Sequence, residues 1–263
     1  MTQPAQIQVT TAERITTLRF DRPDKKNAIT LDMYAALRDG LEAAAGDPAV
    51  RAVVIAGARD CFTAGNDLGD FLRVAQGGST GGGGGGEVSA STSFLRALAT
   101  FDKPLVAAVA GVAIGIGTTM LLHCDLIYAA PNARFKVPFV DLGLVPEAGS
   151  SVLLPALVGH RRAAQLLLLG EQLDAPTALS WGLINGVADD ADAAAHAAAV
   201  RLAACAPGAL RTTKALTRRT TRDAVLEAMR VENEAFAERL RSPEAMEALQ
   251  AFMARRPADF SRF

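Results

Sequence analysis

The chain has 263 residues, of which half are hydrophobic and 21% are charged, and its formal net charge is −1 at pH 7. This composition is typical of a globular protein with one large core, and it excludes an intrinsically disordered or polybasic chain. Nucleic acid is therefore not an expected partner.

The three cysteines are widely spaced and form no CxxC or other metal-ligand pattern, so we expect a reducing, cytoplasmic location. The first twenty residues lack the apolar run and small-residue cleavage site of a secretory signal.

Short apolar runs alternate with amphipathic stretches through the first two hundred residues. The pattern predicts, in chain order, a strand at Arg14 to Phe20, a helix between the cap Thr30 and Gly46, a strand at Ala52 to Ala56, a helix near Ser93 to Thr100 and a strand starting at Leu105. The strands at Ala52 to Ala56 and from Leu105 are apolar throughout, as expected when both faces of a sheet are covered. The sequence therefore predicts an α/β core with parallel strands and crossover helices.

One segment, Leu105 to Leu122, has the length of a membrane span. Its eighteen residues carry no charge, and Gly111 with Gly115 has the GxxxG spacing of packed transmembrane helices. However, the three glycines of this segment would weaken a helix, and Pro104 precedes a run that is typical of a short buried strand entering a turn. We therefore expect a strand here and no membrane partner.

The pattern changes at about Pro207, after which no strand-like run appears and three helical segments follow. Ser242 and Pro243 supply the cap and first-turn proline that begin the last helix. The residues expected to face inward are Val225, Met229, Phe236 and Leu240 in the preceding helix, and Met246, Leu249 and Met253 in the last one. Such helices need an apolar surface to cover, either their own core or a neighbouring subunit. We therefore divide the chain into a core, residues 1–206, and a C-terminal helical segment, residues 207–263, expected to support oligomerisation.

Two glycine-rich stretches resemble nucleotide-binding loops only in composition. The segment 77–86 ends in six consecutive glycines without the Lys-Ser or Lys-Thr of a phosphate loop, so a flexible linker or a lid is expected. In Gly115-Ile116-Gly117 the dinucleotide fingerprint fails, because Met120 replaces its third glycine. The three histidines have no triad or metal spacing, and we expect them to be structural or solvated.

Two apolar strands each lead into a loop of small residues. Val53 to Ile55 precedes the loop at Ala64 to Asp67, and Val106 to Val109 precedes the loop at Gly111 to Gly117. Both loops can expose backbone N–H groups, and two such groups aimed at one carbonyl oxygen form an oxyanion hole. Small residues suit such a site because the ligand must approach the backbone closely.

Seven short motifs follow one another along the chain. They are Arg22-Pro23 with Asn27-Ala28, Phe62-Thr63-Ala64-Gly65-Asn66-Asp67-Leu68, Lys103-Pro104 with Ala108 to Gly115, Cys124-Asp125, Phe135 with Pro138, Leu142-Gly143-Leu144, and Ala178 with Trp181-Gly182-Leu183. Each is weak alone, but their order is specific. The sequence resembles the crotonase superfamily, the enoyl-CoA hydratase and isomerase family, over nearly its whole length.

The resemblance implies a spiral α/β core of ββα repeats and a C-terminal helical segment that builds a homotrimer or a dimer of trimers. It also implies an acyl-CoA thioester as substrate, with no metal and no cofactor beyond the CoA moiety. The oxyanion donors would be the backbone amides of Asn66 and Ile116. The residues implied to contact CoA are Lys25, Lys26, Ala28, Ala64, Asp67 and Leu68, with one of the two lysines near its phosphates.

The residues around these loops favour one reaction of the family. Its hydratases use two glutamates, and the corresponding positions here hold Thr119 and Phe139, so the carboxylate pair that adds water to a double bond is missing. Glu147 stands where Δ3,Δ2-enoyl-CoA isomerases of the peroxisomal type carry a single glutamate. The resemblance implies that Glu147 moves a proton from C2 to C4 of a dienolate, which turns 3-enoyl-CoA into trans-2-enoyl-CoA. The alternatives are another crotonase reaction, such as hydration of 2-enoyl-CoA, and a catalytically silent acyl-CoA-binding module.

Three acidic residues have competing interpretations. An apolar pocket that includes Phe139 would raise the pKa of Glu147 towards neutrality, whereas the alternative makes Glu147 a first-turn acid of a helix that starts at Ala148. Asp67 fits a loop or helix cap beside the oxyanion donor. Asp141 is a helper acid only if its side chain points into the pocket.

Two further groups of residues have both a functional and a structural interpretation. The candidates for the acyl pocket, most of which also fit the core, are Phe71, Leu72, Val112, Phe139, Leu144 and Trp181. A basic stretch in the C-terminal segment forms either a solvated helix face or a contact with the CoA phosphates, from the same or a neighbouring subunit. Its members are Arg211, Lys214, Arg218, Arg219 and Arg222.

Overall fold

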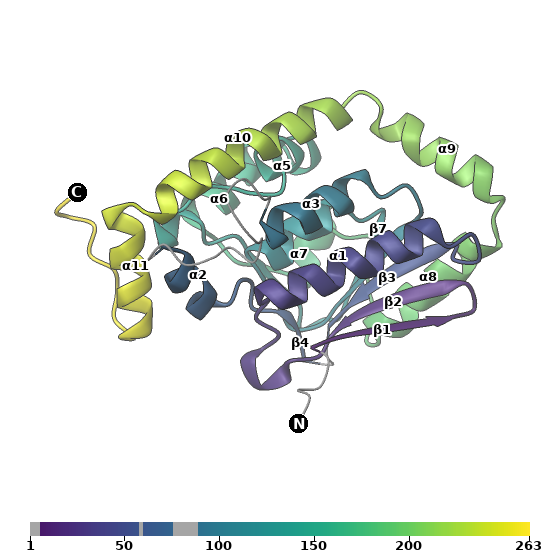
Figure 1. The fold of residues 1–263 in the computed structure, drawn as a ribbon, viewed down its shortest axis with the longest axis horizontal. Helices are drawn as coiled ribbons and strands as arrows, with labels where there is room; N and C mark the ends of the chain where they lie inside the picture. Colours follow the sequence, from purple (N-terminus) through teal and green to yellow (C-terminus); the bar gives the residue numbers. More distant parts are fainter. Residues whose placement is uncertain (1–5, 58–59, 76–88) are drawn as a thin grey trace.

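The computed structural model describes residues 6–57, 60–75 and 89–263, which fold into two sheets surrounded by helices (Figure 1). The larger sheet contains, in spatial order, β1 (Ile7–Ala12), β2 (Ile15–Phe20), β3 (Ala52–Ala56), β5 (Leu105–Val109), β7 (Leu126–Ala129) and β10 (Gly186–Val187). The smaller sheet contains β4 (Cys61–Thr63), β6 (Val112–Ile114), β8 (Arg134–Lys136) and β9 (Leu173–Asp174). The segment 77–86, expected to be a linker or a lid, lies outside the described residues.

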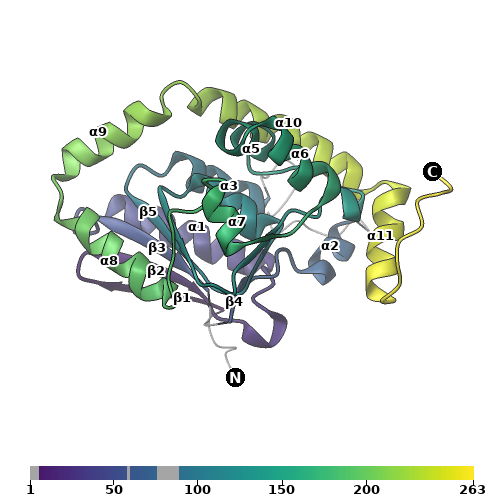
Figure 2. The same cartoon turned by 180° about the vertical axis from the view of Figure 1, so that it is seen from behind.

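The larger sheet is parallel from β2 to β10, and both of its faces are covered. Val53 and Ile55 of β3 join the main core with α1 (Leu31–Gly46) and α3 (Ala90–Thr100), whereas Val54 packs with alanines of α8 (Ala191–Ala204). Figures 1 and 2, seen from opposite sides, show α1 and α8 on opposite faces of the sheet. Two-sided burial explains why β3 and β5 are apolar throughout, and the predicted α/β class is confirmed.

The chain repeats a strand–strand–helix unit. The units are β1-β2-α1, then β3-β4 with α2 (Leu68–Ala75) and α3, then β5-β6-α4 (Ile116–Thr119), then β7-β8 with α5 (Ser150–Val158). The last three units each place their first strand in the larger sheet and their second in the smaller one. The chain therefore advances as the predicted spiral. The remaining elements before residue 206 are α6 (His160–Leu169), α7 (Ala175–Ser180) and the 3-10 helices η1 (Pro23–Lys25), η2 (Met120–His123) and η3 (Val140–Leu142).

Strand β1 is not predicted by the sequence pattern. It is an edge strand, paired with β2 on one side, and after Ile7 its residues are exposed. An exposed edge strand needs no apolar residues, so its sequence has no buried-strand pattern. The hairpin turn places Glu13 and Arg14 at φ of 51° and 65°, so β2 starts at Ile15 and not at the predicted Arg14.

The uncharged segment Leu105 to Leu122 forms β5, β6, α4 and part of η2, which confirms the predicted buried strand. Among the described residues, no single helix has both the length and the apolar character needed to cross a membrane. Within the described ranges one pair of helices, α8 and α9 (Pro207–Arg218), together meets these criteria by length and composition, and this pair is bent by 112°.

Three helices follow residue 206, as predicted: α9, α10 (Arg222–Leu240) and α11 (Pro243–Met253). In Figure 1 the ribbon of α9 lies away from the two sheets and connects α8 to α10, whereas α10 lies across α5 and α3. The predicted stripe of α10 faces inward, with Phe236 partly buried and its other three members buried. The expectation for Met253 is wrong, because it is 62% exposed while Leu249 is buried.

The C-terminal half of α9 carries a buried ion pair that involves Lys214, for which the sequence left two interpretations, a solvated helix face and a contact with the CoA phosphates. Lys214 is buried, and its Nζ donates to the carboxylate of Asp125 at 2.7 Å and to the backbone oxygen of Lys103 at 2.6 Å. Arg218 also donates to Asp125, at 2.9 Å, and Arg211 pairs with Asp102. For Lys214 the solvated interpretation is therefore wrong.

Asp125→Asn is expected to lower the free energy of unfolding by about 2–4 kcal/mol, because it leaves the buried Lys214 charge without a counter-charge. Asp102→Asn is a matched control, since it removes an ion pair in which both side chains are about half exposed, and we expect a loss below about 1 kcal/mol. Urea unfolding of the three proteins measures both values. Equal losses would contradict the assigned burial of the Lys214 pair.

Candidate active site

The two predicted oxyanion loops adjoin because the strands that lead into them are neighbours. β4 and β6 pair in parallel, so the segments that leave their carboxyl ends emerge side by side. A Cβ atom on Gly65 would lie 2.7 Å from the backbone oxygen of Ile114, and one on Gly117 would lie 2.6 Å from Cγ2 of Thr63. Only glycine fits at these two positions without displacing the other loop.

The backbone amides of Asn66 and Ile116 are available to a ligand. Asn66 stands opposite Ile29 in an isolated parallel bridge, whose bonds use the oxygen of Gly65 and the amide of Asp67. Ile116 is the first residue of α4, where an amide has no acceptor one turn earlier. Neither amide donates to an acceptor among the described residues.

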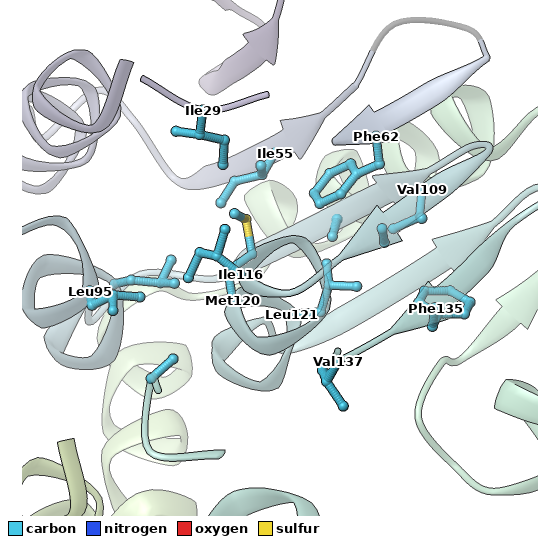
Figure 3. Packing of buried hydrophobic residues seen from close by; sticks show 14 of the residues in the cluster. Ile29, Ile55, Phe62, Leu95, Val109, Ile116, Met120, Leu121, Phe135 and Val137 are labelled. Atoms are coloured by element: carbon cyan, nitrogen blue, oxygen red, sulfur yellow. The ribbon is translucent and has the colours of Figure 1, made fainter. Parts of the chain in front are cut away.

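The side chains of both residues fix their amides in place. The Ile116 side chain is fully buried, and Figure 3 shows it with Met120 and Leu121 in the same cluster as Ile55 and Leu95. The Asn66 side chain accepts a hydrogen bond at 2.5 Å from the hydroxyl of Tyr34 on α1. Both amides are therefore preorganised, which is what charge stabilisation in a transition state requires.

Asn66 and Ile116 line one outer cavity of about 700 Å³, within the size range of small-molecule sites. Its lining also includes all six residues implied to contact CoA, namely Lys25, Lys26, Ala28, Ala64, Asp67 and Leu68. Three acyl-pocket candidates, Phe71, Phe139 and Leu144, line it as well. The C-terminal segment supplies a wall that the sequence does not predict, through Ala248, Ala251, Phe252, Met253 and Arg256.

Three acyl-pocket candidates are not among the residues that line this cavity. Leu72 packs against the main core. Val112 lies in β6, which pairs with β4 on one side and β8 on the other. Trp181 lies under the guanidinium of Arg162, 5.2 Å from the ring centroid. None of the three is thus in the lining of this cavity, and an apolar residue in a sequence does not show whether it packs in the core or lines a pocket.

Glu147 lines a second, inner cavity of about 210 Å³. The two cavities share Asn66, Asp67, Phe71 and Phe236 in their linings, so they meet at the oxyanion loop. The predicted base and one predicted oxyanion donor therefore face the same small space. The inner cavity is otherwise lined mainly by α1, α3 and α10, through residues that include Tyr34, Leu95 and Leu240.

The carboxyl of Glu147 is buried and weakly solvated. The residue is 7% exposed, and its Oε1 atom has no hydrogen-bond partner among the described residues. Burial raises the pKa of Glu147 to about 8, and the negative charge of Glu232 contributes further. In turn, the Glu147 charge adds to the effect of burial that raises the pKa of Tyr34. A buried acid with such a pKa can both accept and donate a proton near neutral pH.

The alternative that Glu147 is a first-turn acid of a helix is wrong. Helix α5 begins at Ser150, and Gly149 is its N-cap residue. Before it, Ala148 and Gly149 have φ of 62° and 70°, which turns the chain sharply and keeps the helix from starting at Ala148. Sequence reasoning could not place this boundary, because a positive φ at an alanine is uncommon.

Of the two positions where hydratases carry glutamates, one holds a threonine that is hydrogen-bonded to the backbone and the other holds a phenylalanine. Thr119 is fully buried, and its hydroxyl donates to the backbone oxygen of Gly115 at 3.4 Å. Phe139 is buried and lines the outer cavity. Within the described residues, then, neither position supplies a carboxylate to the space beside the oxyanion loops.

The two other acidic candidates are already engaged. Asp67 accepts a hydrogen bond from Arg22 at 2.7 Å and caps α2 through the amide of Gly69 at 2.9 Å. Burial opposes these bonds, but they prevail and lower the pKa of Asp67. Asp141 lines the outer cavity, yet its side chain is half exposed and pairs with Lys136 at 3.0 Å. Asp67 is the predicted cap, and Asp141 lies at the solvent side of the cavity.

His123 contacts the turn that follows Glu147, although the sequence around it gave no reason to distinguish it from the other histidines. It is buried, and its Nε2 lies 2.8 Å from the backbone oxygen of Ala148. Burial lowers its pKa to about 4, so at neutral pH the ring is uncharged and the Nε2–H tautomer donates this bond. Tyr34, His123 and Glu232 are the residues around the site that sequence reasoning missed, because tertiary packing alone brings them there.

A spiral of strand–strand–helix units, with two adjoining loops that present free amides, is the architecture of the crotonase superfamily. Residues 10–262 match the family described as enoyl-CoA hydratase/isomerase. The chain belongs to the enoyl-CoA hydratase/isomerase family.

Its relatives include both isomerases and hydratases. Enoyl-CoA delta isomerase 2 of Rattus norvegicus is 35% identical over 253 residues, which cover 95% of this chain but only 64% of the rat protein. The 2,3-dehydroadipyl-CoA hydratase of Escherichia coli K12 is 31% identical over 259 residues, or 96% of this chain and 97% of that one. The crystal structure of an enoyl-CoA hydratase/isomerase from Pseudoalteromonas atlantica T6c has a TM-score of 0.89 and 40% identity, and covers 97% of this chain and 99% of that chain. Similarity establishes the family, and the choice of reaction depends on the site.

Proposed function

We propose that this protein is an enoyl-CoA isomerase that converts 3-enoyl-CoA into trans-2-enoyl-CoA. One observation carries the proposal: Glu147 is a buried carboxyl with an oxygen atom that has no partner in the described part of the chain, and it faces the same inner cavity as Asn66. The other two acids of that cavity, Asp67 and Asp70, are paired with arginines. The name of the rat relative, enoyl-CoA delta isomerase 2, denotes the same class of reaction.

The proposed chemistry needs one base and one oxyanion hole. The Glu147 carboxylate takes a proton from C2 of the 3-enoyl thioester, and the electron pair of that C–H bond delocalises onto the thioester oxygen on one side and through the C3=C4 double bond onto C4 on the other. The amides of Asn66 and Ile116 donate hydrogen bonds to the resulting dienolate. The protonated Glu147 then returns the proton to C4, so the double bond moves to C2–C3 and the base is regenerated.

The CoA moiety is assigned to the outer cavity. Lys25 and Lys26 are exposed at its edge and suit the phosphates of CoA, while Ala28, Ala64 and Leu68 leave room for the pantetheine arm. The reaction as written uses no metal or redox cofactor. A homotrimer or dimer of trimers, and a cytoplasmic location, belong to the same proposal.

Substrate choice by the purified protein tests the reaction. We expect 3-hexenoyl-CoA to be converted into trans-2-hexenoyl-CoA, and crotonyl-CoA to be hydrated far more slowly because Thr119 and Phe139 supply no second carboxylate. In D2O the product should gain deuterium at C4 when the proton of Glu147 exchanges with solvent. Hydration of crotonyl-CoA without isomerisation would instead identify a hydratase. Binding of CoA thioesters without any turnover would identify a silent acyl-CoA-binding module.

A further inference from the structure

Glu232 of α10 is a second buried carboxylate close to Glu147. It is 7% exposed, and its two oxygens accept hydrogen bonds from the backbone amides of Gly149 at 2.6 Å and Ser151 at 2.9 Å. These amides belong to the N-terminus of α5, which has no capping side chain of its own. Free amides and the helix dipole make this end of a helix a favourable place for an anion. Helix α10 therefore supplies, from 81 to 83 residues further along the chain, the cap that α5 lacks.

The segment capped by Glu232 is the one that carries Glu147. Between Glu147 and α5 the chain turns through two residues with positive φ, Ala148 and Gly149. The hydroxyl and the amide of Ser150 donate to the backbone oxygen of Glu147 at 2.6 and 3.0 Å, and His123 holds the oxygen of Ala148. The amide of Gly149 is held by Glu232. The backbone groups of this turn are thus held by hydrogen bonds, and Glu232 is the hydrogen-bond partner that comes from the C-terminal segment.

We propose that Glu232 is a positioning residue that acts through Glu147: it fixes the turn that aims the Glu147 carboxyl into the inner cavity and sets a second negative charge behind it. This inference rests on the proposed function of Glu147 as the proton carrier. The packing of α10 would then affect the ability of Glu147 to act as the base. Helix α10 also lines the inner cavity itself, through Asn233 and Phe236.

The charges around Glu147 show why Glu232 matters. No Lys, Arg or His side chain is among the described residues that line the inner cavity. The ionisable groups that face Glu147 from the described part of this lining are Tyr34 of α1 and Asp67 and Asp70 around α2, and both aspartates are paired with arginines. Burial and the charge of Glu232 together raise the pKa of Glu147. Behind the turn, His123 is uncharged at neutral pH because burial lowers its pKa to about 4.

The test uses Glu232→Gln, which removes the charge and one hydrogen-bond acceptor, and Glu232→Asp, which keeps the charge on a shorter side chain. Glu234→Gln is the matched control, because Glu234 is exposed on the same helix and pairs only with Arg230 among the described residues. The first readout is kcat/KM for 3-hexenoyl-CoA against pH. We expect Glu232→Gln to move its midpoint to lower pH by about half to one unit and to lower kcat about tenfold. Glu232→Asp should keep the midpoint with a lower kcat, and Glu234→Gln should match the parent.

A second readout follows the titration of Glu147 without catalysis. The difference in unfolding free energy between the parent and Glu147→Gln is measured against pH, with Glu232 present and with Gln at that position. We expect the midpoint of this difference to move to lower pH in the Glu232→Gln background. A merely structural contact of Glu232 would lower stability equally at all pH values and would leave both midpoints in place.

The outcomes separate this inference from the proposed function. Unmoved midpoints in a folded Glu232→Gln protein overturn the inference. If Glu232→Gln does not fold, Glu232→Asp decides, because a parent-like kcat in that variant overturns the inference and a lower kcat at an unchanged midpoint supports it. If the parent shows no isomerase activity, the proposed function fails, while the unfolding measurement still reports whether Glu232 controls the ionisation of Glu147.

Discussion

Glu147→Gln is expected to lower kcat for the isomerisation of 3-hexenoyl-CoA by about 10³-fold or more. An amide has nearly the shape of the carboxyl group but cannot take the proton from C2, and the pairing of Asp67 and Asp70 with arginines leaves the inner cavity without another free base among the described residues. KM should change little, since CoA is assigned to the outer cavity. Steady-state kinetics of the parent and the variant measure both constants. A variant as active as the parent would sink the proposed mechanism.

The same substitution should also remove a pH dependence of activity. The base form of Glu147 is needed to start the reaction, and burial raises its pKa to about 8, so kcat/KM of the parent should rise with pH and level off above about 8. The residual activity of Glu147→Gln should lack this rise. A parent profile that is already flat from pH 6 upward would show that Glu147 ionises as an ordinary exposed acid does.

Stability should respond to pH in the opposite sense. The pKa of Glu147 lies at about 8 in the folded protein and near 4.5 in the unfolded chain, so between these values the folded state binds more protons. Relative to high pH, proton binding by Glu147 thus stabilises the folded state fully below about pH 4.5, and this stabilisation is lost as pH rises through about 8. The unfolding free energy of Glu147→Gln minus that of the parent should therefore increase by on the order of 2–4 kcal/mol from pH 5 to pH 9. Urea unfolding at both pH values measures this gain.

The larger features of the fold could be predicted from sequence because they depend on local patterns. Buried parallel strands such as β3 and β5 are uniformly apolar, and Thr30 caps α1 as expected. The close approach of the two loops could be predicted because it requires glycine at Gly65 and Gly117, whereas their role as an oxyanion hole stays a prediction. In each of these cases the physical requirement acts on consecutive residues, so it leaves a pattern in the sequence.

The support of the site left no such pattern. Tyr34 lies on the apolar face of an amphipathic helix, where its ring indicates core packing and nothing indicates that its hydroxyl meets Asn66. In the sequence, Glu232 is one of several acids on α10. Its burial depends on hydrogen bonds from the amides of Gly149 and Ser151, which are more than 80 residues away along the chain. Met253 fits an inward stripe, yet it is exposed beside the outer cavity because the wall of that cavity is built by α11. These features arise from contacts between segments far apart in the chain.

Gly65→Ala is expected to lower kcat/KM for 3-hexenoyl-CoA by about 10²- to 10³-fold, the cost of a misplaced oxyanion donor. Gly65 has φ of 90°, and a Cβ there would lie 2.7 Å from the backbone oxygen of Ile114. The two loops must therefore separate, which turns the Asn66 amide away from the position it shares with the amide of Ile116. The strain itself should cost about 1–3 kcal/mol of unfolding free energy.

Gly46→Ala is the control for this substitution. Gly46 ends α1, and a Cβ there meets no atom within 4 Å, so kcat/KM should stay within about twofold of the parent and stability should not fall. Kinetics at a pH above 8, where Glu147 is ionised, keep the base constant while the oxyanion hole is altered. If Gly65→Ala is folded and turns over as fast as Gly46→Ala, the amide of Asn66 is not an oxyanion donor. The carboxyl of Glu147 would then need a different partner for the charge that it creates on the thioester oxygen.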